Sequence, residues 1–467
     1  MIKEELIFRW GYEGGGSKVF RIKEKSETRI IEFSSRVDFE DIDVWHQDKK
    51  EYPSFDCLWE EAVKNDKWFR LSPVFIHDDV KPTIIKSFDD IDKTSLTEHE
   101  KLSIESWSEL LFTYPGINDW QKNRYAFMAR YNRQEGITDF GVSKAGRRYH
   151  HLLKDTDSNR RHNFLNIPEI LEEVKHRHED HKLGDYPRLL TNTVASQPCC
   201  FNLFVPLRNN TELASKLFSK LMGKQVEVKH IELEFTPYKD SKDDRKLKDF
   251  EFKGDETLGD QSEFAGTDAD VAVFYTYSEQ KRGVILIEFK YIEAEFSVCS
   301  SFKKKKLVQN ICSNHGFYQK LIEPYLTNSL ENPLCGYLKY ENWKLLNKSS
   351  VFDLESIKTA DYCPFRYSLQ QLWRNMLLAQ NVKEIRGLDE FFFWVLYPEQ
   401  NKALWNQKGK TSVEDCFRKK ITLAGDKCFA RKELKKDFVD NLMALVSQEN
   451  EKEWMKKFEE RYLSEVD

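Results

Sequence analysis

The sequence predicts an α/β (α+β) fold built on a mixed sheet with helices on both sides. Four apolar runs of strand length lie in the second half of the chain, at residues 228–235, 266–274, 284–291 and 391–397. A helical pattern separates the last run from the other three, and helices placed between strands in this order indicate a mixed sheet covered on both faces. With 467 residues, the chain is long enough for two or three domains.

Amphipathic helices are predicted on either side of these strands. One spans residues 210–222 behind a capping asparagine, and its apolar face consists of Leu213, Leu217, Phe218 and Leu221. A second begins near residue 369, and its apolar face consists of Leu369, Leu372, Trp373, Met376 and Leu377. Residues 430–463 predict two further helices.

The order of these patterns predicts three segments. Residues 1–95 alternate short strand-like runs with turns, for example at 6–10 and 18–22, and predict a small β-rich accessory domain. A stretch rich in Ser, Asp and Thr at residues 87–100 predicts a linker, and residues 96–195 are expected to be mostly helical. Residues 196–467 hold the mixed sheet and the C-terminal helices.

Charged residues gather at one end of two neighbouring predicted strands. Glu288 and Lys290 are two residues apart on an apolar run, so a strand places both side chains on one face. Asp270 stands near the start of the preceding run. Burying such charges at a strand end is costly unless they pair or hold a metal, so the pattern indicates a chemical role.

A hairpin between the two runs would bring Asp270 to the same end. If Tyr277 lies opposite Val284, Asp270 falls opposite Tyr291, or opposite the preceding lysine after a slip of one residue. Asp268 would then lie roughly 7 Å further out, so Asp270 is the preferred carboxylate.

An Asp, a Glu and a Lys at one strand end predict a site for a divalent cation. Two carboxylates suit Mg²⁺, for which Mn²⁺ can substitute, and the carbonyl of Phe289 could add an oxygen ligand. A metal-bound water and the ammonium of Lys290 suit hydrolysis of a phosphodiester. The alternative for Asp270, Glu288 and Lys290 is a structural salt bridge at the end of a hairpin.

Four segments around these residues resemble a known family. They occur in the order 196–207 (SQPCCFNLFVPL), 231–237 (IELEFTP), 287–293 (IEFKYIE) and 367–375 (YSLQQLWRN). Together with Asp270 they resemble a group of bacterial restriction-endonuclease-like proteins in the PD-(D/E)xK nuclease superfamily, over roughly residues 145–400. The chain has Ala269 where the motif usually has proline.

The resemblance implies a restriction-endonuclease-like core and a role for each motif residue. Asp270 and Glu288 would be metal ligands, and Lys290 the catalytic lysine. Glu234 would be the upstream acidic residue that many members add to the metal site. The polar helix residues beside the site would be Gln371 and Arg374. From the residues alone, Glu234 could also be a solvated carboxylate, and an exposed polar face is the default explanation of Gln371 and Arg374.

The net charge of −5 excludes a protein that binds nucleic acid through its overall charge, so phosphate contacts would have to be local. Weak candidates for DNA contacts are the basic residues Lys281, Arg282, Lys303, Lys304, Lys305 and Lys306. Such charge runs are also common on solvated faces.

Nine cysteines without a CxxC pair predict neither a zinc ribbon nor a disulfide framework. The N-terminus lacks a signal-peptide pattern, and no apolar run approaches the roughly 18 residues of a membrane span. A reduced, cytoplasmic setting is the expectation.

The resulting expectation is a Mg²⁺-dependent endonuclease that hydrolyses DNA, and the resemblance implies a role in restriction or anti-phage defence. Two alternatives stay open. The chain could be a non-cleaving binding module on a nuclease fold, or the nuclease subunit of a multi-protein defence complex that meets a partner through residues 1–100.

Overall fold

The structure is a computed structural model that describes the strands between residues 5 and 84 and, with short gaps, residues 118–235, 269–326 and 342–464. Packing of the backbone divides the chain into two compact units. The first comprises Met1–Arg160, Leu190–Val194 and Val466–Asp467, and the second comprises Arg161–Leu189 and Ala195–Glu465. Each is described by itself.

The first unit contains a six-stranded antiparallel sheet in the order β4-β3-β2-β1-β5-β6. Its strands are β1 (Glu5–Tyr12), β2 (Gly16–Lys25), β3 (Thr28–Ser34), β4 (Lys50–Tyr52), β5 (Arg70–Ile76) and β6 (Thr83–Ile84). The predicted strands at 6–10 and 18–22 fall within β1 and β2, while the predicted linker lies outside the described residues. The accessory domain as such remains a prediction.

The same unit includes helix α3 (Asp119–Gln134) and a hairpin of β7 (Phe140–Val142) and β8 (Arg148–Leu153). Helix α3 packs against β8. The segment up to residue 195 continues with α4 (Asp157–His162), α5 (Pro168–Glu179) and α6 (Tyr186–Thr191), of which α5 belongs to the second unit. The hairpin adds two strands to the helices expected there, because a three-residue strand is too short to show a period of two.

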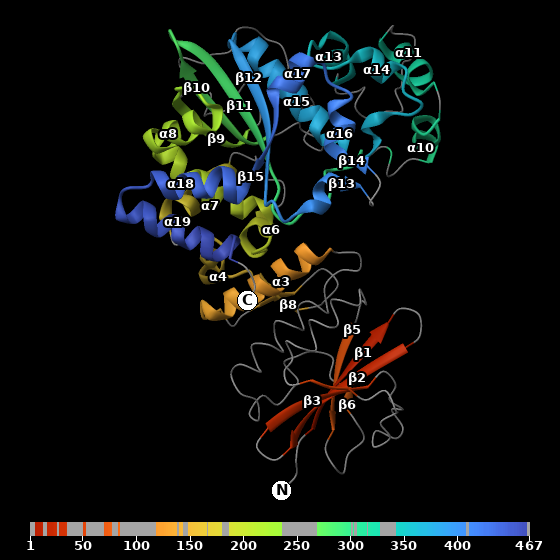
Figure 1. Cartoon of the computed structure of the whole chain (residues 1–467), viewed down its shortest axis with the longest axis vertical. Helices are drawn as coiled ribbons and strands as arrows, with labels where there is room; N and C mark the ends of the chain where they lie inside the picture. The colour runs from red at the N-terminus through yellow and green to blue at the C-terminus, as the bar shows by residue number, and fades with distance from the viewer. Residues whose placement is uncertain are drawn as a thin grey trace. The chain divides into compact units, whose positions relative to one another are not determined.

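The second unit is built on a five-stranded sheet in the order β15-β12-β11-β10-β9 (Figure 1). Its strands are β9 (Glu227–Phe235), β10 (Ala269–Tyr277), β11 (Lys281–Phe289), β12 (Glu390–Tyr397) and β15 (Phe429–Glu433). β9, β10 and β11 are antiparallel neighbours, whereas β11, β12 and β15 run parallel. The predicted mixed sheet is therefore confirmed.

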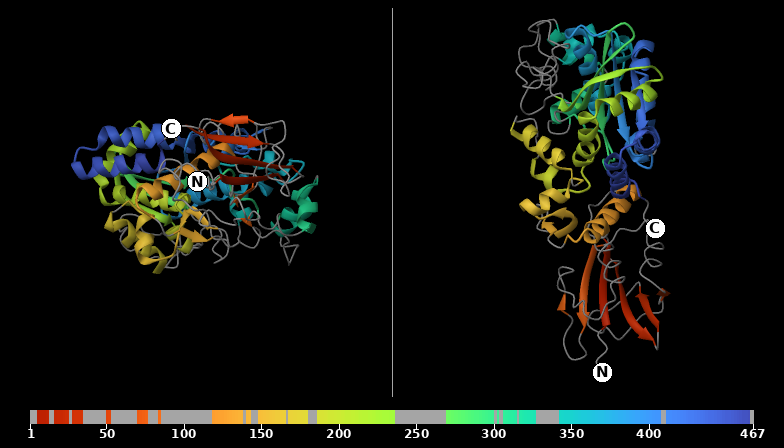
Figure 2. Two further views of the ribbon diagram at one scale, coloured as in Figure 1. Left: turned by 90° about the horizontal axis from the view of Figure 1, so that it is seen from below. Right: turned by 90° about the vertical axis from the view of Figure 1, so that its left-hand side faces the viewer.

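Helices cover both faces of this sheet (Figures 1 and 2). Helix α15 (Leu369–Ile385) packs against β11 and β12, and helices α7 (Ser196–Asn209) and α8 (Thr211–Met222) pack against β9. Successive side chains of the strands point to opposite faces, so the sheet packs against both helix layers. Phe274 and Leu286 belong to the core with α15, while Trp394 stacks on Phe218 of α8 with ring centroids 6.0 Å apart. The predicted flanking helices are confirmed.

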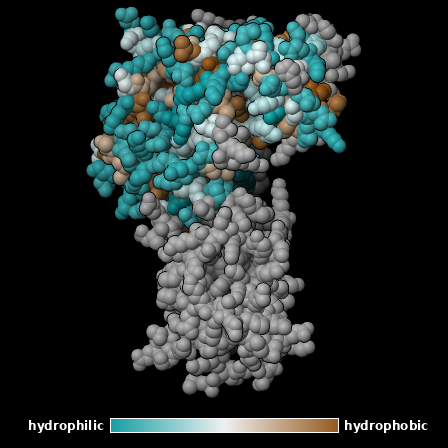
Figure 3. Space-filling model, turned by 45° about the vertical axis from the view of Figure 1, so that its right-hand side comes forward, coloured by the Kyte–Doolittle hydropathy of each residue, from teal (hydrophilic) through white to brown (hydrophobic). Residues whose placement is uncertain are grey.

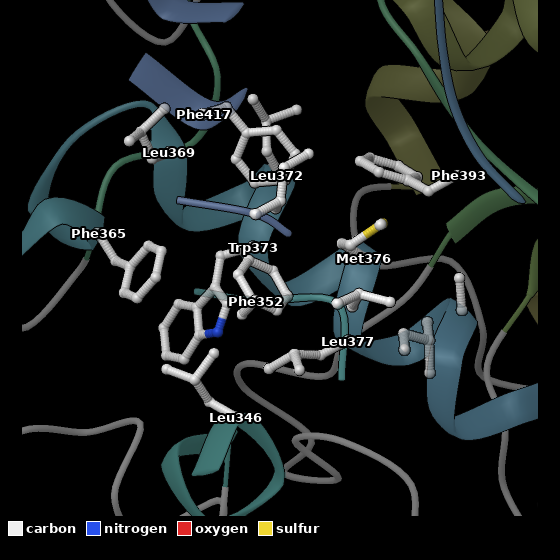
Figure 4. Packing of buried hydrophobic residues seen from close by; sticks show 14 of the residues in the cluster. Leu346, Phe352, Phe365, Leu369, Leu372, Trp373, Met376, Leu377, Phe393 and Phe417 are labelled. Atoms are coloured by element: carbon white, nitrogen blue, oxygen red, sulfur yellow. The ribbon is translucent and has the colours of Figure 1, made fainter. Parts of the chain in front are cut away.

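Shorter elements surround the α15 face of the sheet. They are α10 (Lys306–Cys312), π-helix η5 (Tyr318–Ile322), α11 (Glu323–Leu326), α13 (Asn342–Lys348), α14 (Leu354–Lys358), η6 (Pro364–Arg366), η7 (Lys402–Trp405), β13 (Asn406–Gln407), β14 (Thr411–Ser412), α16 (Val413–Arg418) and α17 (Leu423–Cys428). Their core centres on Trp373, whose ring stacks on Phe365 at 4.2 Å and lies 5.2 Å from the ring of Trp343. Figure 4 shows Trp373 and Phe365 among the surrounding leucines and phenylalanines.

The C-terminal segment differs from the sequence prediction at its start. Residues 430–433 belong to strand β15, followed by η8 (Leu434–Val439), α18 (Asp440–Leu445) and α19 (Glu449–Tyr462). The expected helix begins later because these residues pair with β12, a long-range contact that local periodicity does not show. The apolar residues Phe438, Leu442 and Phe458 are buried as their helical spacing predicts.

The space-filling view shows a mainly hydrophilic face over the coloured part of the molecule, with apolar residues scattered singly (Figure 3). Among the described residues, no helix combines the length and apolar character that a membrane crossing requires.

Candidate active site

Three neighbouring strands bring three carboxylates to one end of the sheet. Val271 pairs with Ile287 on β11 and with Leu233 on β9. The preceding residue of β10, Asp270, therefore lies beside Glu288 on one side and beside Glu234 on the other. Directly opposed side chains on antiparallel strands share a face and lie about 4.5–5.5 Å apart at Cβ.

The register of the β10–β11 hairpin differs from the predicted one. Tyr277 pairs with Lys281, so Asp270 faces Glu288, three residues before the predicted Tyr291. The turn is shorter because Glu279 and Gln280 adopt left-handed φ values of 56° and 69°. The pairing also places Gly283 opposite Tyr275, where a Cβ atom would lie 2.3 Å from the tyrosine ring. The expectation that Asp270 reaches the Glu288 end holds despite this shift.

Asp270 is an acceptor in a crowded acidic environment. Its Oδ2 accepts a hydrogen bond from the backbone N–H of Phe289 at 2.6 Å. Burial and the neighbouring carboxylates Glu288 and Glu234 raise the pKa of Asp270 well above its ordinary value, against the opposing effects of Lys290 and the Phe289 N–H. A carboxylate beside two others gains from a nearby cation.

Glu288 accepts from three donors, one on the residue after β11 and two on α15. Its side chain is buried, and Oε1 lies 2.7 Å from Lys290 Nζ and 2.6 Å from Gln371 Nε2. Oε2 accepts from Asn375 Nδ2 at 2.5 Å. Gln371 and Asn375 stand one turn apart on α15 and fix both oxygens of the carboxylate.

Lys290 follows directly after β11, and its N–H donates to the Leu396 carbonyl at 2.9 Å. Burial opposes the charge of Lys290, but Glu288, Glu293 and Asp270 outweigh burial and hold the pKa of the ammonium above its ordinary value. The side chain therefore carries a positive charge at neutral pH, next to the carboxylates.

Glu234 occupies an unusual backbone conformation at the end of β9. Its φ is 48°, in the left-handed region that non-glycine residues seldom adopt. The side chain accepts a hydrogen bond from Gln197 Nε2 at 2.8 Å, near the start of α7. The adjacent Ser196 Oγ donates to Glu293 Oε1 at 2.6 Å. Strained backbone of this kind is concentrated at functional sites.

The other predicted site residues are placed differently. Lys281 and Arg282 begin β11, at the opposite end from Glu288 and roughly 23 Å away by strand rise. Lys306 is the exposed first residue of α10. Asp268, Lys303, Lys304 and Lys305 lie outside the described residues. Arg374 is half-buried on α15, where the neighbouring Asn375 is the residue that contacts Glu288.

Sequence reasoning overlooked four contributors to this cluster: Ser196, Gln197, Glu293 and Asn375. Each lies in one of the segments that carry the family resemblance, which was the available signal. Asn375 stands off the apolar face of its helix in the sequence, yet it is only 3% exposed, because α15 is covered on that side by the end of β11.

The donor chemistry fits a hard divalent cation. Asp270 and Glu288 supply carboxylate oxygens, and Mg²⁺ is typically bound by one or two carboxylates while it keeps several waters. In the part of the chain that the structure describes, no three His, Cys, Asp or Glu side chains form a ready-made metal cage. A cation at this site would therefore rely on two carboxylates and water.

A mixed sheet with Asp270 on one strand and Glu288-x-Lys290 on the next defines a nuclease-type domain. A family model described as the PD-(D/E)XK nuclease superfamily matches residues 120–334 and 344–464. The match spans most of the chain, and the chain belongs to this superfamily, whose members typically use divalent metals. No curated protein and no solved structure matches it.

Proposed function

We propose that this chain is a metal-dependent endonuclease that hydrolyses DNA phosphodiester bonds, with a role in restriction or anti-phage defence in the cytoplasm. Superfamily membership supports nuclease chemistry on nucleic acid in general. The observation that carries the finer proposal is the convergence of Asp270, Glu288 and Lys290 at one end of the sheet.

The proposed roles follow from charge and position. Asp270 and Glu288 hold a divalent cation, Mg²⁺ or Mn²⁺, with Glu234 as a further acidic contributor from β9. When bound, such a cation lowers the pKa of a water ligand and stabilises negative charge on a phosphoryl oxygen. Lys290 keeps its proton and donates hydrogen bonds, which orients the attacking water and stabilises the charge that develops on the phosphate.

The proposed role of helix α15 is to position Glu288, and its side chains take no part in the reaction itself. Gln371 Oε1 also accepts the backbone N–H of Ser297 at 3.0 Å, so this side chain is fixed from both ends of its amide. Asn375 fixes the second oxygen of Glu288. Preorganised ligands of this kind need no rearrangement of the helix when the site is used.

The test is cleavage of supercoiled plasmid by the full chain with Mg²⁺ or Mn²⁺. The expected result is nicking that chelator abolishes and that Asp270→Ala or Lys290→Ala reduces by at least about a hundredfold. Lys457→Ala, a partly exposed lysine on α19, is the matched control and should retain cleavage. Cleavage that survives both site variants would overturn the proposal, as would tight metal-independent DNA binding without any cleavage.

A further inference from the structure

Three cysteines from separate segments line one small pocket beside α15. Cys299 follows β11, Cys312 ends α10, and Cys363 precedes η6. They share the pocket with Trp343, Phe365 and Arg366. No disulfide joins these three cysteines. Cys312 and Cys299 stand 51 and 64 residues before Cys363, so the fold and not a CxxC spacing brings them together.

Cys312 and Cys363 are direct neighbours in this pocket. The backbone N–H of Cys363 donates to the carbonyl of Cys312 at 3.0 Å. The two side chains also hydrogen-bond each other and line the same pocket. A disulfide requires two cysteines at short range with converging Cβ atoms, and the backbone hydrogen bond and the shared pocket place this pair close together.

The surroundings of the Cys312 thiol favour its thiolate form. Its hydrogen bond with Cys363 lowers the pKa of Cys312, burial acts in the opposite direction, and the nearby Arg366 lowers the pKa further. Arg366 also donates to the Cys312 carbonyl at 3.4 Å. By contrast, burial raises the pKa of Cys199 well above its ordinary value, which is typical of an inert structural thiol.

The cysteine pocket and the candidate active site share two segments of chain. Cys363 and Arg366 lead directly into α15, which presents Gln371 to Glu288. Cys299 stands two residues after Ser297, whose N–H binds the Oε1 of the same Gln371. A change of geometry at the cysteines is therefore transmitted along the backbone to the residue that orients Glu288.

We propose that Cys312 and Cys363 form a redox pair that peroxide converts into a disulfide, and that this bond slows cleavage at the proposed nuclease site. The second half of this inference depends on the proposed function. The Cys312 thiolate attacks a peroxide oxygen, which forms a sulfenic acid and releases hydroxide that becomes water on protonation. The Cys363 thiol then attacks that sulfur, the S–S bond forms, and a second water leaves. The two sulfurs lose two electrons in total, and hydrogen peroxide gains them.

The physical reason for lower activity is displacement of α15. Two hydrogen-bonded sulfur atoms must approach to about 2.05 Å when they bond. Cys363 is eight residues from Gln371 across a short 3-10 turn, so the shift is carried into the start of the helix. A misplacement of about 1 Å at a catalytic group can cost about a hundredfold in rate.

The experiment treats the full chain with hydrogen peroxide, alkylates the remaining thiols and digests the protein without reductant. Mass spectrometry is expected to find a peptide that links Cys312 to Cys363, lost after treatment with dithiothreitol and absent in Cys363→Ser. Cys428→Ser, a half-buried cysteine on α17, is the matched control and should still form the link. A link through Cys299 instead, or no link at all, would overturn the redox pair.

Plasmid cleavage is measured on the same samples. Oxidation is expected to lower the rate of the wild type at least about tenfold, with recovery in dithiothreitol, and to leave Cys363→Ser less affected. Formation of the link with an unchanged rate would overturn the switch. If the reduced protein does not cleave DNA, the proposed function fails. The mass of the linked peptide still shows whether Cys312 and Cys363 form a disulfide.

Discussion

Asn375 Nδ2 lies 2.5 Å from Glu288 Oε2, while Gln371 Nε2 takes the other carboxylate oxygen at 2.6 Å. Two amides one turn apart on α15 therefore fix the plane of a buried carboxylate at the end of β11. Lys290 Nζ binds the same carboxylate at 2.7 Å. The position of Glu288 is thus set by a helix that lies more than eighty residues further along the chain.

Asn375→Ala is expected to lower metal-dependent cleavage about ten- to a hundredfold, because Glu288 loses the donor on Oε2 and gains rotational freedom. Plasmid nicking at several Mg²⁺ concentrations checks this. Gln380→Ala is the matched control on the same helix, since the Gln380 amide hydrogen-bonds Glu384 and Ser349 and does not contact Asp270 or Glu288. Equal loss in both variants would show that Asn375 matters only for helix stability.

Lys290→Met is expected to lower the free energy of unfolding by about 3–5 kcal/mol in chelator, because it leaves the charge of Glu288 buried without its cation. Urea denaturation checks this value. The double variant Lys290→Met with Glu288→Gln should recover most of the loss, since both charges are then gone. A loss that the second substitution fails to relieve would argue against a buried ion pair.

Asp270→Asn is expected to stabilise the metal-free protein at neutral pH, by on the order of 1 kcal/mol. The pKa of Asp270 is raised in the folded state, so folded protein binds the proton more tightly than unfolded protein does. Stability of the wild type therefore falls as pH rises from the ordinary Asp range, near about 3.9, through the raised pKa of the folded state. Asn keeps an oxygen for the Phe289 N–H and removes this decline.

Thermal unfolding measured across pH with and without Mg²⁺ tests this linkage. The wild type should gain stability on addition of Mg²⁺ at neutral pH, and Asp270→Asn should gain much less. The opposite pH trend, with wild-type stability rising through this range, would show that Asp270 is stabilised as an anion without metal.

Glu234→Gln is expected to weaken the apparent Mg²⁺ affinity about tenfold and to slow cleavage less than Asp270→Asn does. The substitution keeps an oxygen for Gln197 and removes only the charge. Glu279→Gln is the control, because Glu279 shares the left-handed backbone but lies in the turn at the other end of β10. Unchanged Mg²⁺ dependence would make Glu234 an ordinary polar residue of the strand end.

Much of this protein could be predicted from its sequence because the signals are local. The strands β9 to β12 and the helices α8 and α15 follow from apolar periodicity, as do their buried faces. Glu288 and Lys290 share a strand end by spacing alone. The prediction of helix over residues 430–433 was wrong, because these residues form β15 by pairing with β12. The predicted register of Asp270 was also wrong, because it depends on a short left-handed turn and on the Tyr275–Gly283 contact.

The sequence by itself determined which residue types stand at the ends of the central strands, since alternation and spacing are properties of neighbouring residues. Only the tertiary structure decided which distant residues meet. Asn375 contacts Glu288, Gln197 contacts Glu234, and Cys312 contacts Cys363. These pairs come from segments separated by 37 to 87 residues. Packing of whole helices onto the sheet brings them together, and no local pattern in the chain encodes that.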